Sequence, residues 1–226
     1  MKKKSACAVN PTLACGNLLN FEGDLDILEK TGIQMVHIDI MDGHYVPNLC
    51  FNVDTVAAIR KNYSFFLDVH LMVSNPEFYL RPLQRAGADA VSFHQDVVRF
   101  PIRLLKQIHQ LGMKGGIVLN PVQQVESLIE LLPYLDFVVV MGVEPGFSGQ
   151  RFLERTIDKV GRLDKFRMEL PSSFLIEVDG GIDFDNTVSL VKNGADVLVS
   201  GAFGVFSGKN SLEEDCRKYQ EFVKTC

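Results

Sequence analysis

The chain has 226 residues, of which 46% are hydrophobic and 23% charged, an ordinary composition for a globular protein with a sizeable core. The formal net charge of −5 excludes a global positive field for nucleic acid, and the basic run Lys2–Lys4 is followed by no apolar stretch that would make a signal peptide. No segment approaches the roughly 18 apolar residues that cross a bilayer, so with the negative net charge we expect neither a membrane nor a nucleic-acid partner. The five scattered cysteines suit a reducing, cytoplasmic location.

Short apolar or β-branched runs alternate with helical hydrophobic patterns along the chain. Eight runs are predicted strands: Ala8–Leu13, Met35–Met41, Phe65–Leu71, Ala90–His94, Lys114–Leu119, Phe137–Met141, Phe174–Asp179 and Val197–Gly201. Helical patterns lie between them: Leu18–Thr31, Val53–Asn62, Glu77–Ala86, Pro101–Leu111, Val122–Leu132, Leu153–Leu170 and Asp185–Asn193. Gly32, Gly87 and Gly194 stand where a left-handed glycine commonly ends a helix.

The number of strand–helix units indicates the fold class. Alternation of strands with helices predicts an α/β protein with a parallel sheet. Eight such units in 226 residues favour a closed (β/α)8 TIM barrel over a doubly wound sheet. Because no linker or low-complexity stretch interrupts the pattern, we expect residues 1–226 to form a single domain.

Polar residues occupy one face of several predicted strands. Side chains alternate along a strand, so the apolar face of each barrel strand meets the helices and the other face points inward. In Met35–Met41, "LDVHLM" and "LIEVDGG", the inward positions include these polar residues: His37, Asp39, Asp68, His70, Glu177 and Asp179. We expect those nearest the C-terminal mouth of the barrel to meet there, where catalysis occurs in this fold.

Two imidazoles and two carboxylates make a candidate divalent-metal site, formed by His37, Asp39, His70 and Asp179. The alternative is a hydrogen-bonded polar cluster without metal. Four such residues at equivalent strand ends favour the metal, and we expect one ion per chain. The mixed nitrogen and oxygen ligands accept Zn, with Fe, Mn, Co and Mg as the other choices.

Glycine-rich turns follow the last three predicted strands and indicate a phosphate site. They read "EPGFSGQ", "DGGI" and "SGAFG". Glycine lets the backbone approach a ligand closely, and successive amides cradle an anion. The predicted contacts in these turns are Gly146, Phe147, Ser148, Gly149, Gly180, Gly181, Gly201 and Ala202.

Other histidines and the methionines receive more modest interpretations. We expect His109 to lie on a helix surface, His44 to shape a loop, and His94 to have a structural role although it ends a strand near the site. Three inward methionines at strand ends are predicted to form an apolar rim around the substrate that excludes water: Met41, Met72 and Met141.

The motifs "HIDIMDGHYVPN", "DVHLMV", "VMGVEPGFSGQRF" and "IEVDGGI" resemble the ribulose-phosphate 3-epimerase family. The resemblance runs from about Asn10 to Phe206. It implies a TIM barrel, usually homo-oligomeric, that inverts C3 of a ketose phosphate with a bound divalent metal. On this resemblance, the four candidate ligands hold the metal, Asp39 and Asp179 are the acid/base pair, and Thr12 and His70 contact the substrate.

The implied chemistry explains the residue types. The hydrogen on C3 lies next to the C2 carbonyl, so one carboxylate removes it and the second carboxylic acid returns a proton to the opposite face. A metal stabilises the enediolate charge that develops between these steps.

Substrate size is left open between two sugars. The first strand reads "NPTLAC" where the family typically reads "PSIL", Gly142 replaces a usual threonine, and Ser148 replaces a usual glycine. The loop "GAFGVF" is one residue longer than the common form and resembles that of the sister D-allulose-6-phosphate 3-epimerases. On its frequency in the family, D-ribulose 5-phosphate, converted to D-xylulose 5-phosphate, is the first expectation. On this loop, D-allulose 6-phosphate, converted to D-fructose 6-phosphate, is the alternative.

Different functional classes are less favoured. A decarboxylase of this fold has a lysine in an Asp-x-Lys-x-x-Asp array, and "DIMD" has none. A Schiff-base aldolase needs a lysine at the carboxyl end of a strand, whereas Lys114 begins its strand. A non-catalytic sugar-phosphate-binding protein would not need both Asp39 and Asp179.

Overall fold

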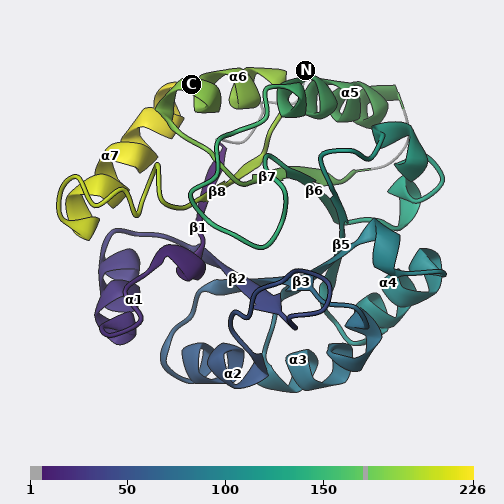
Figure 1. The fold of residues 1–226 in the computed structure, drawn as a ribbon, viewed down its shortest axis with the longest axis horizontal. Helices are drawn as coiled ribbons and strands as arrows, with labels where there is room; N and C mark the ends of the chain where they lie inside the picture. The colour runs from purple at the N-terminus through teal and green to yellow at the C-terminus, as the bar shows by residue number, and fades with distance from the viewer. Residues whose placement is uncertain (1–6, 170–172) are drawn as a thin grey trace.

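Eight parallel strands form the centre of the computed structural model, which describes residues 7–169 and 173–226. They are β1 (Ala8–Pro11), β2 (Met35–Met41), β3 (Phe66–Met72), β4 (Ala90–His94), β5 (Lys114–Leu119), β6 (Phe137–Met141), β7 (Leu175–Asp179) and β8 (Val197–Ser200). The strand order is β1-β8-β7-β6-β5-β4-β3-β2, and a bridge between Thr12 and His37 links β1 to β2 (Figure 1). The predicted (β/α)8 barrel is confirmed.

Helices surround the strands on the outside of the ring (Figure 1). They are α1 (Phe21–Lys30), α2 (Val53–Asn62), α3 (Leu80–Ala86), α4 (Pro101–Gln110), α5 (Arg155–Glu169), α6 (Phe184–Asn193) and α7 (Leu212–Thr225). Gly32, Gly87 and Gly194 have φ angles of +81°, +87° and +114° at the ends of their helices, which confirms the predicted left-handed stops. The basic run Lys2–Lys4 and the predicted helix end at Leu170 lie outside the described residues.

Some element boundaries differ from the sequence prediction. The first strand ends at Pro11 because Thr12 caps a 3₁₀ turn, η1 (Leu13–Cys15). The expected helix Glu77–Ala86 divides into η2 (Pro76–Phe78) and α3.

The prediction of an α-helix over Val122–Leu132 was wrong. The segment contains the 3₁₀ helix η4 (Val125–Leu128) and runs into a second one, η5 (Leu132–Tyr134). Pro133 disfavours the α conformation at the residue before it, which limits helix growth at this end. Helix α7 was not predicted, although Ser211 and Glu214 form a capping box at its start.

Hydrophobic side chains are buried on both faces of the sheet, as strand alternation predicts. Outward side chains of the strands pack against the helices, among them Val36, Ile38, Ile40, Leu67, Val69, Leu71, Ile176 and Val178. A smaller cluster fills the barrel interior: Ala90, Val118, Phe137, Val139 and Met141. A Cβ on Gly116 would lie 2.4 Å from the Phe137 ring, so this glycine makes room for the aromatic side chain inside the barrel. These apolar side chains share the barrel interior with the inward polar residues of β2, β3 and β7.

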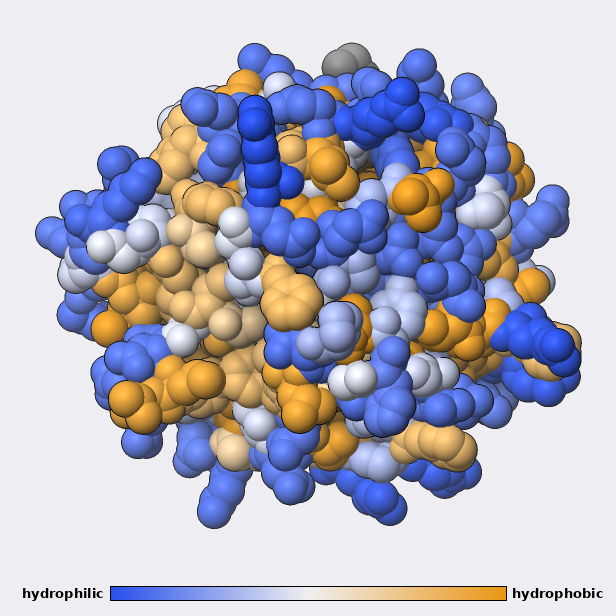
Figure 2. All heavy atoms as spheres, in the orientation of Figure 1, coloured by the Kyte–Doolittle hydropathy of each residue, from blue (hydrophilic) through white to orange (hydrophobic). Residues whose placement is uncertain are grey.

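Figure 2 shows the mouth-side face with the orientation of Figure 1. Apolar side chains gather on the part of this face between α1 and α7, and hydrophilic side chains cover much of the remainder. The exposed apolar residues of the protein include Leu18, Leu19, Leu49, Phe147 and Phe203. The expected homo-oligomer stays a prediction. None of the helices within residues 7–169 and 173–226 has the length and apolar character needed to span a membrane.

Candidate active site and metal centre

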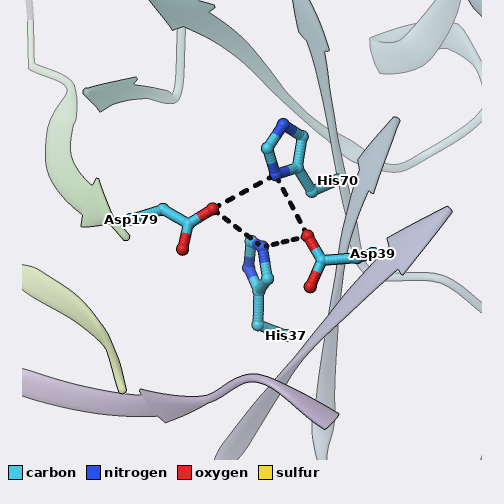
Figure 3. Close-up of side chains that lie close together, drawn as sticks. All are labelled: His37, Asp39, His70 and Asp179. Carbon is cyan, nitrogen blue, oxygen red and sulfur yellow. Dashed lines mark ion pairs between the residues drawn. The ribbon is translucent and has the colours of Figure 1, made fainter. Parts of the chain in front are cut away.

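The four candidate ligands come from three strands and meet inside the mouth (Figure 3). His37 and Asp39 lie on β2, His70 on β3, and Asp179 ends β7. The register of β2 and β3 pairs Asp39 directly with His70. All four residues are buried, with exposed fractions between 0% and 8%, and we refer to them as the His–Asp quartet.

One nitrogen or oxygen atom of each quartet residue faces the others. Asp39 Oδ1 lies 3.4 Å from both His37 Nε2 and His70 Nδ1. Asp179 Oδ2 lies 3.8 Å and 3.5 Å from the same two nitrogens (Figure 3). All four atoms lie within 4.8 Å of one another, a separation that a single cation between them would accommodate.

The donor set also fits a metal in its chemistry. His37 Nε2, Asp39 Oδ1 and His70 Nδ1 are buried and have no hydrogen-bond partner among the described residues. Buried polar atoms are nearly always satisfied, so three such atoms aimed at one point indicate a missing positive partner. Imidazole nitrogens and carboxylate oxygens are ligands of divalent transition metals. The quartet could therefore hold a divalent metal ion.

The non-facing nitrogens of the two imidazoles each have a close neighbour. His37 Nδ1 lies 2.6 Å from Asp68 Oδ2, and Asn10 Nδ2 donates to that same oxygen at 2.9 Å. His70 Nε2 lies 2.8 Å from His94 Nε2, and the two rings are stacked with centroids 4.9 Å apart. His94 thus supports a quartet residue from behind, in line with the structural role expected for it.

Burial and charge act in opposite directions on the quartet. Burial alone would raise the pKa of Asp39, but the His37 and His70 imidazoles hold this pKa well below its ordinary value. Burial alone would lower the pKa of His37, but the Asp39 and Asp68 carboxylates raise it. Glu177 lies behind His37, and its burial together with the nearby Asp68 carboxylate raises the Glu177 pKa to about 8. The neighbouring charges, more than burial, keep Asp39 ionised.

A pocket opens from the quartet to the surface at the mouth. The space between its lining residues, with open solvent at the entrance included, is about 570 Å³. The residues predicted to bind substrate line it together, apart from the fully buried His70: Thr12, Met41, Met72, Met141, Gly146, Phe147, Ser148, Gly149, Gly180, Gly181, Gly201 and Ala202. Asp39 and Asp179 lie at its base.

The three glycine-rich turns share one wall of this pocket. Gly146, Gly149, Gly180 and Gly181 have positive φ angles of +109°, +78°, +105° and +67°, a conformation that favours glycine. Gly201 has a different reason for lacking a side chain, because a Cβ there would lie 2.9 Å from Cys15 Sγ and 3.2 Å from Thr12 Cγ2.

The loop after β6 is braced by side-chain hydrogen bonds. Asn48 Nδ2 donates to the carbonyl of Gly146 at 2.8 Å, and Gln150 Nε2 donates to the carbonyls of Glu144 and Phe147. These bonds engage carbonyl oxygens of the turn and involve none of its N–H groups.

The remaining histidines lie where the sequence placed them. His109 pairs with Asp136 on the outside of α4, and His44 bonds to the backbone of Asp42 within its own loop. The sequence interpretation placed Asp68 and Glu177 on the inner face without assigning them a role, and it did not single out Asn10. Asn10, Asp68 and Glu177 each stand two residues before another inward polar residue, and this spacing could have indicated that they lie next to the site. The structure also adds pocket-lining residues that were not predicted: Ala14, Cys15, Val143, Glu144, Pro145, Gln150, Ile182, Val199 and Phe203.

Solved structures with the same fold are only distantly similar in sequence. The tryptophan synthase α-subunit from Pyrococcus furiosus superimposes with a TM-score of 0.71 at 16% identity, covering 100% of both chains. The orotidine 5'-phosphate decarboxylase from Pyrococcus horikoshii OT3 has a TM-score of 0.68 at 17% identity, covering 96% of this chain and 99% of the other. These similarities concern the barrel alone.

Sequence comparison is much more specific. Residues 8–206 match the model of the ribulose-phosphate 3 epimerase family. Ribulose-phosphate 3-epimerase from Aquifex aeolicus is 37% identical over 213 residues, covering 94% of this chain and 95% of that protein. The enzyme of the same name from Treponema pallidum is 41% identical over 198 residues, covering 88% and 90%. The chain therefore belongs to the ribulose-phosphate 3-epimerase family and is an isomerase of the epimerase class.

Proposed function

We propose that the protein interconverts D-ribulose 5-phosphate and D-xylulose 5-phosphate by inverting C3. The observation that carries this proposal is the pair of carboxylates, Asp39 and Asp179, at the base of one pocket. They reach it from β2 and β7, which are separated in the ring by β1 and β8. The printed names of the similar proteins support the choice of a ribulose phosphate.

The two aspartates are the proposed acid and base. An ionised carboxylate removes the hydrogen from C3, and a protonated carboxyl delivers a proton to the opposite face of the same carbon. Thr12 Oγ1 donates to Asp39 Oδ2 at 2.7 Å, which fixes the orientation of that carboxylate. The two proposed proton-transfer groups come from different strands, and inversion requires that they reach opposite faces of C3.

The His–Asp quartet is the proposed holder of one divalent ion, with zinc as the first candidate. The unpartnered atoms of His37, Asp39 and His70 support this proposal, since their types match zinc ligands. A bound divalent ion would stabilise the negative charge that develops on the substrate oxygens as C3 loses its proton.

The upper parts of the pocket are proposed to hold the rest of the substrate. The amides of the glycine-rich turns bind the phosphate, since no lysine or arginine belongs to these turns and oriented amides attract anions. Met41 and Met72 pack together with Val46 beside the quartet, and Met141 lines the same pocket. These apolar side chains exclude water from the reactive intermediate.

Solvent deuterium exchange tests the proposal. The metal-replete protein is incubated in D₂O with D-ribulose 5-phosphate and, separately, with D-allulose 6-phosphate, and kcat/KM is measured for each. We expect deuterium at C3 and a higher kcat/KM for the pentulose. Higher activity on the hexulose would assign the substrate to the alternative that the loop Gly201–Phe206 resembles. Binding of either sugar without label at C3 would identify a non-catalytic sugar-phosphate-binding protein.

A further inference from the structure

A connected set of polar side chains lies one step deeper in the barrel than the pocket. Its members are Asn10, His37, Asp68 and Glu177, which we call the lower polar set. Each stands two residues before an inward polar residue nearer the mouth: Thr12, Asp39, His70 and Asp179 respectively. All four are buried, with exposed fractions of at most 3%, so solvent does not satisfy them.

Asp68 has the shortest contact to the back of His37. The strand register places Asp68 directly beside His37, and the Oδ2–Nδ1 distance is 2.6 Å. Glu177 Oε1 also approaches Nδ1, but at 3.3 Å. Asn10 Nδ2 donates to Asp68 Oδ2 at 2.9 Å, so the position of the Asp68 carboxylate is itself fixed.

This contact determines which nitrogen of His37 is free to bind a metal. A neutral imidazole carries one N–H and one lone pair, and an ionised carboxylate only accepts hydrogen bonds. A carboxylate 2.6 Å from Nδ1 therefore holds the proton on Nδ1 and leaves the lone pair on Nε2. Nε2 is the atom that faces Asp39 and Asp179.

We propose that Asp68 is a positioning residue for metal binding, which holds His37 in the Nδ1–H tautomer and fixes the direction of its Nε2 lone pair, with Asn10 holding Asp68. The inference rests on the proposed metal role of the quartet. Hydrogen-bond partners of this kind behind metal-ligating histidines typically change metal affinity by about 10- to 100-fold.

Zinc affinity of the whole 226-residue chain is the first measurement. The purified chain is stripped of metal, and its Zn²⁺ dissociation constant is determined by competition with a chromophoric chelator. We expect Asp68→Ala to weaken zinc binding by about 10- to 100-fold. Asn10→Ala should weaken it less, because Asp68 remains and loses only its support.

The tautomer of His37 is the second measurement, and a general packing defect would not reverse it. In ¹⁵N-histidine-labelled apoprotein, kept at a pH high enough for the His37 imidazole to be neutral, long-range ¹H–¹⁵N correlation spectra should show His37 protonated on Nδ1. The Asp68→Ala variant should lose this preference. Asp68→Asn keeps an oxygen that can accept from Nδ1–H, so it should retain the tautomer and recover part of the affinity, and it serves as the readout if Asp68→Ala does not fold.

Two buried neighbours provide matched controls. Ser92→Ala removes a buried hydroxyl from β4 that has no hydrogen-bond partner among the described residues. Glu177→Gln keeps the size of the farther carboxyl. Both variants should bind zinc within about threefold of the unaltered protein, a threshold well below the effect expected at Asp68.

Three results would overturn the inference. A folded Asp68→Ala variant with unchanged zinc affinity and an unchanged His37 tautomer would show that Asp68 does not position the ring. Equal losses in Asp68→Ala and Glu177→Gln would remove the distinction between the two carboxyls. Failure of the unaltered protein to bind zinc would reject the proposed metal site along with this inference, whereas zinc binding that is insensitive to residue 68 would reject the inference alone.

Discussion

Thr12 Oγ1 donates a 2.7 Å hydrogen bond to Asp39 Oδ2 across the junction of β1 and β2. The other oxygen of Asp39 is the one that faces His37 and His70. The two oxygens of this carboxylate therefore have different partners: Oδ2 accepts the Thr12 hydrogen bond, and Oδ1 faces the two imidazoles. The resemblance to the family suggested only a substrate contact for Thr12, and the structure adds this contact with a proposed catalytic group.

Removing the Thr12 hydroxyl should impair catalysis more than folding. Thr12→Val leaves a buried carboxylate oxygen without its donor, and a hydrogen bond to a charged group contributes about 1.5–3 kcal/mol. We expect kcat/KM to fall by about tenfold or more, and Thr12→Ser to retain most of the activity. Equal activity of the valine and serine variants would contradict a role for this hydrogen bond.

The quartet should hold about one divalent ion per chain, as one set of four converging ligand atoms indicates. His37→Ala removes one of those ligands and should release the metal, as measured by elemental analysis after dialysis. His109→Ala is the matched control, because His109 pairs with Asp136 on the outer surface. Full metal occupancy in the His37 variant would reject the assignment of that ligand.

Removing either carboxyl of the proposed acid/base pair should impair catalysis without unfolding the protein. Asp39→Asn and Asp179→Asn each keep the side-chain shape and remove the ionisable carboxyl. General acid–base catalysis contributes about 10²- to 10⁴-fold, so each variant should lose at least about 10²-fold in epimerisation rate. Circular dichroism should show both variants folded. Near-native turnover by either one would rule out the two-carboxylate mechanism.

The glycine-rich turns should make binding depend on the substrate phosphate. We expect the unphosphorylated ketoses to have a strongly raised KM, because the turn amides would lose their anion. Equal kinetics with and without the phosphate would show that these glycines serve the backbone turns only.

Gly201 offers a second test of the same wall. Gly201→Ala should raise KM because the added Cβ would lie 2.9 Å from Cys15 Sγ and push the two pocket-lining segments apart. Combining it with Cys15→Ala removes that sulfur and should restore part of the affinity. If the double variant binds no better than the single one, the Cys15 contact is not the cause.

Asp136 lies just before β6, at the end of the barrel opposite the mouth, and its surroundings predict that it contributes to stability in a pH-dependent way. Burial alone would raise its pKa, but the Gly115 N–H, Lys114 and His109 lower it. A carboxyl with a lowered folded-state pKa stabilises the fold above its unfolded pKa of about 3.9, and this stabilisation is lost as the pH falls through the folded value.

Asp136→Asn should therefore lower Tm at pH 7 by about 2–4 °C, for a loss of about 1 kcal/mol. The difference from the unaltered protein should shrink near pH 3. Glu221→Gln, at an exposed position on α7, is the control and should leave Tm unchanged. A Tm difference that is the same at both pH values would exclude charge as its source.

The sequence predicted the barrel and the quartet because both depend on strand alternation. Once β2 is a strand with Ile38 toward the helices, His37 and Asp39 must point inward. The short contact of Asp68 with His37 depends on which residues of neighbouring strands pair, and a single strand's pattern does not contain that register. The missed helix α7 and the 3₁₀ turns over 125–134 reflect end effects of capping and proline that hydrophobic periodicity does not record.

The two-residue spacing of the lower polar set below the mouth residues has a consequence for how this site tolerates change. On β2, β3 and β7, and on β1 continued to Thr12, two polar residues two positions apart share the inward face. Inserting a single residue between the two would place them on opposite faces of the strand, so that one of them turns toward the helices. Loops at the mouth are free of this parity constraint. Length variation that preserves activity should therefore fall in the loops, and within these four strands only insertions of even length keep the inward pattern.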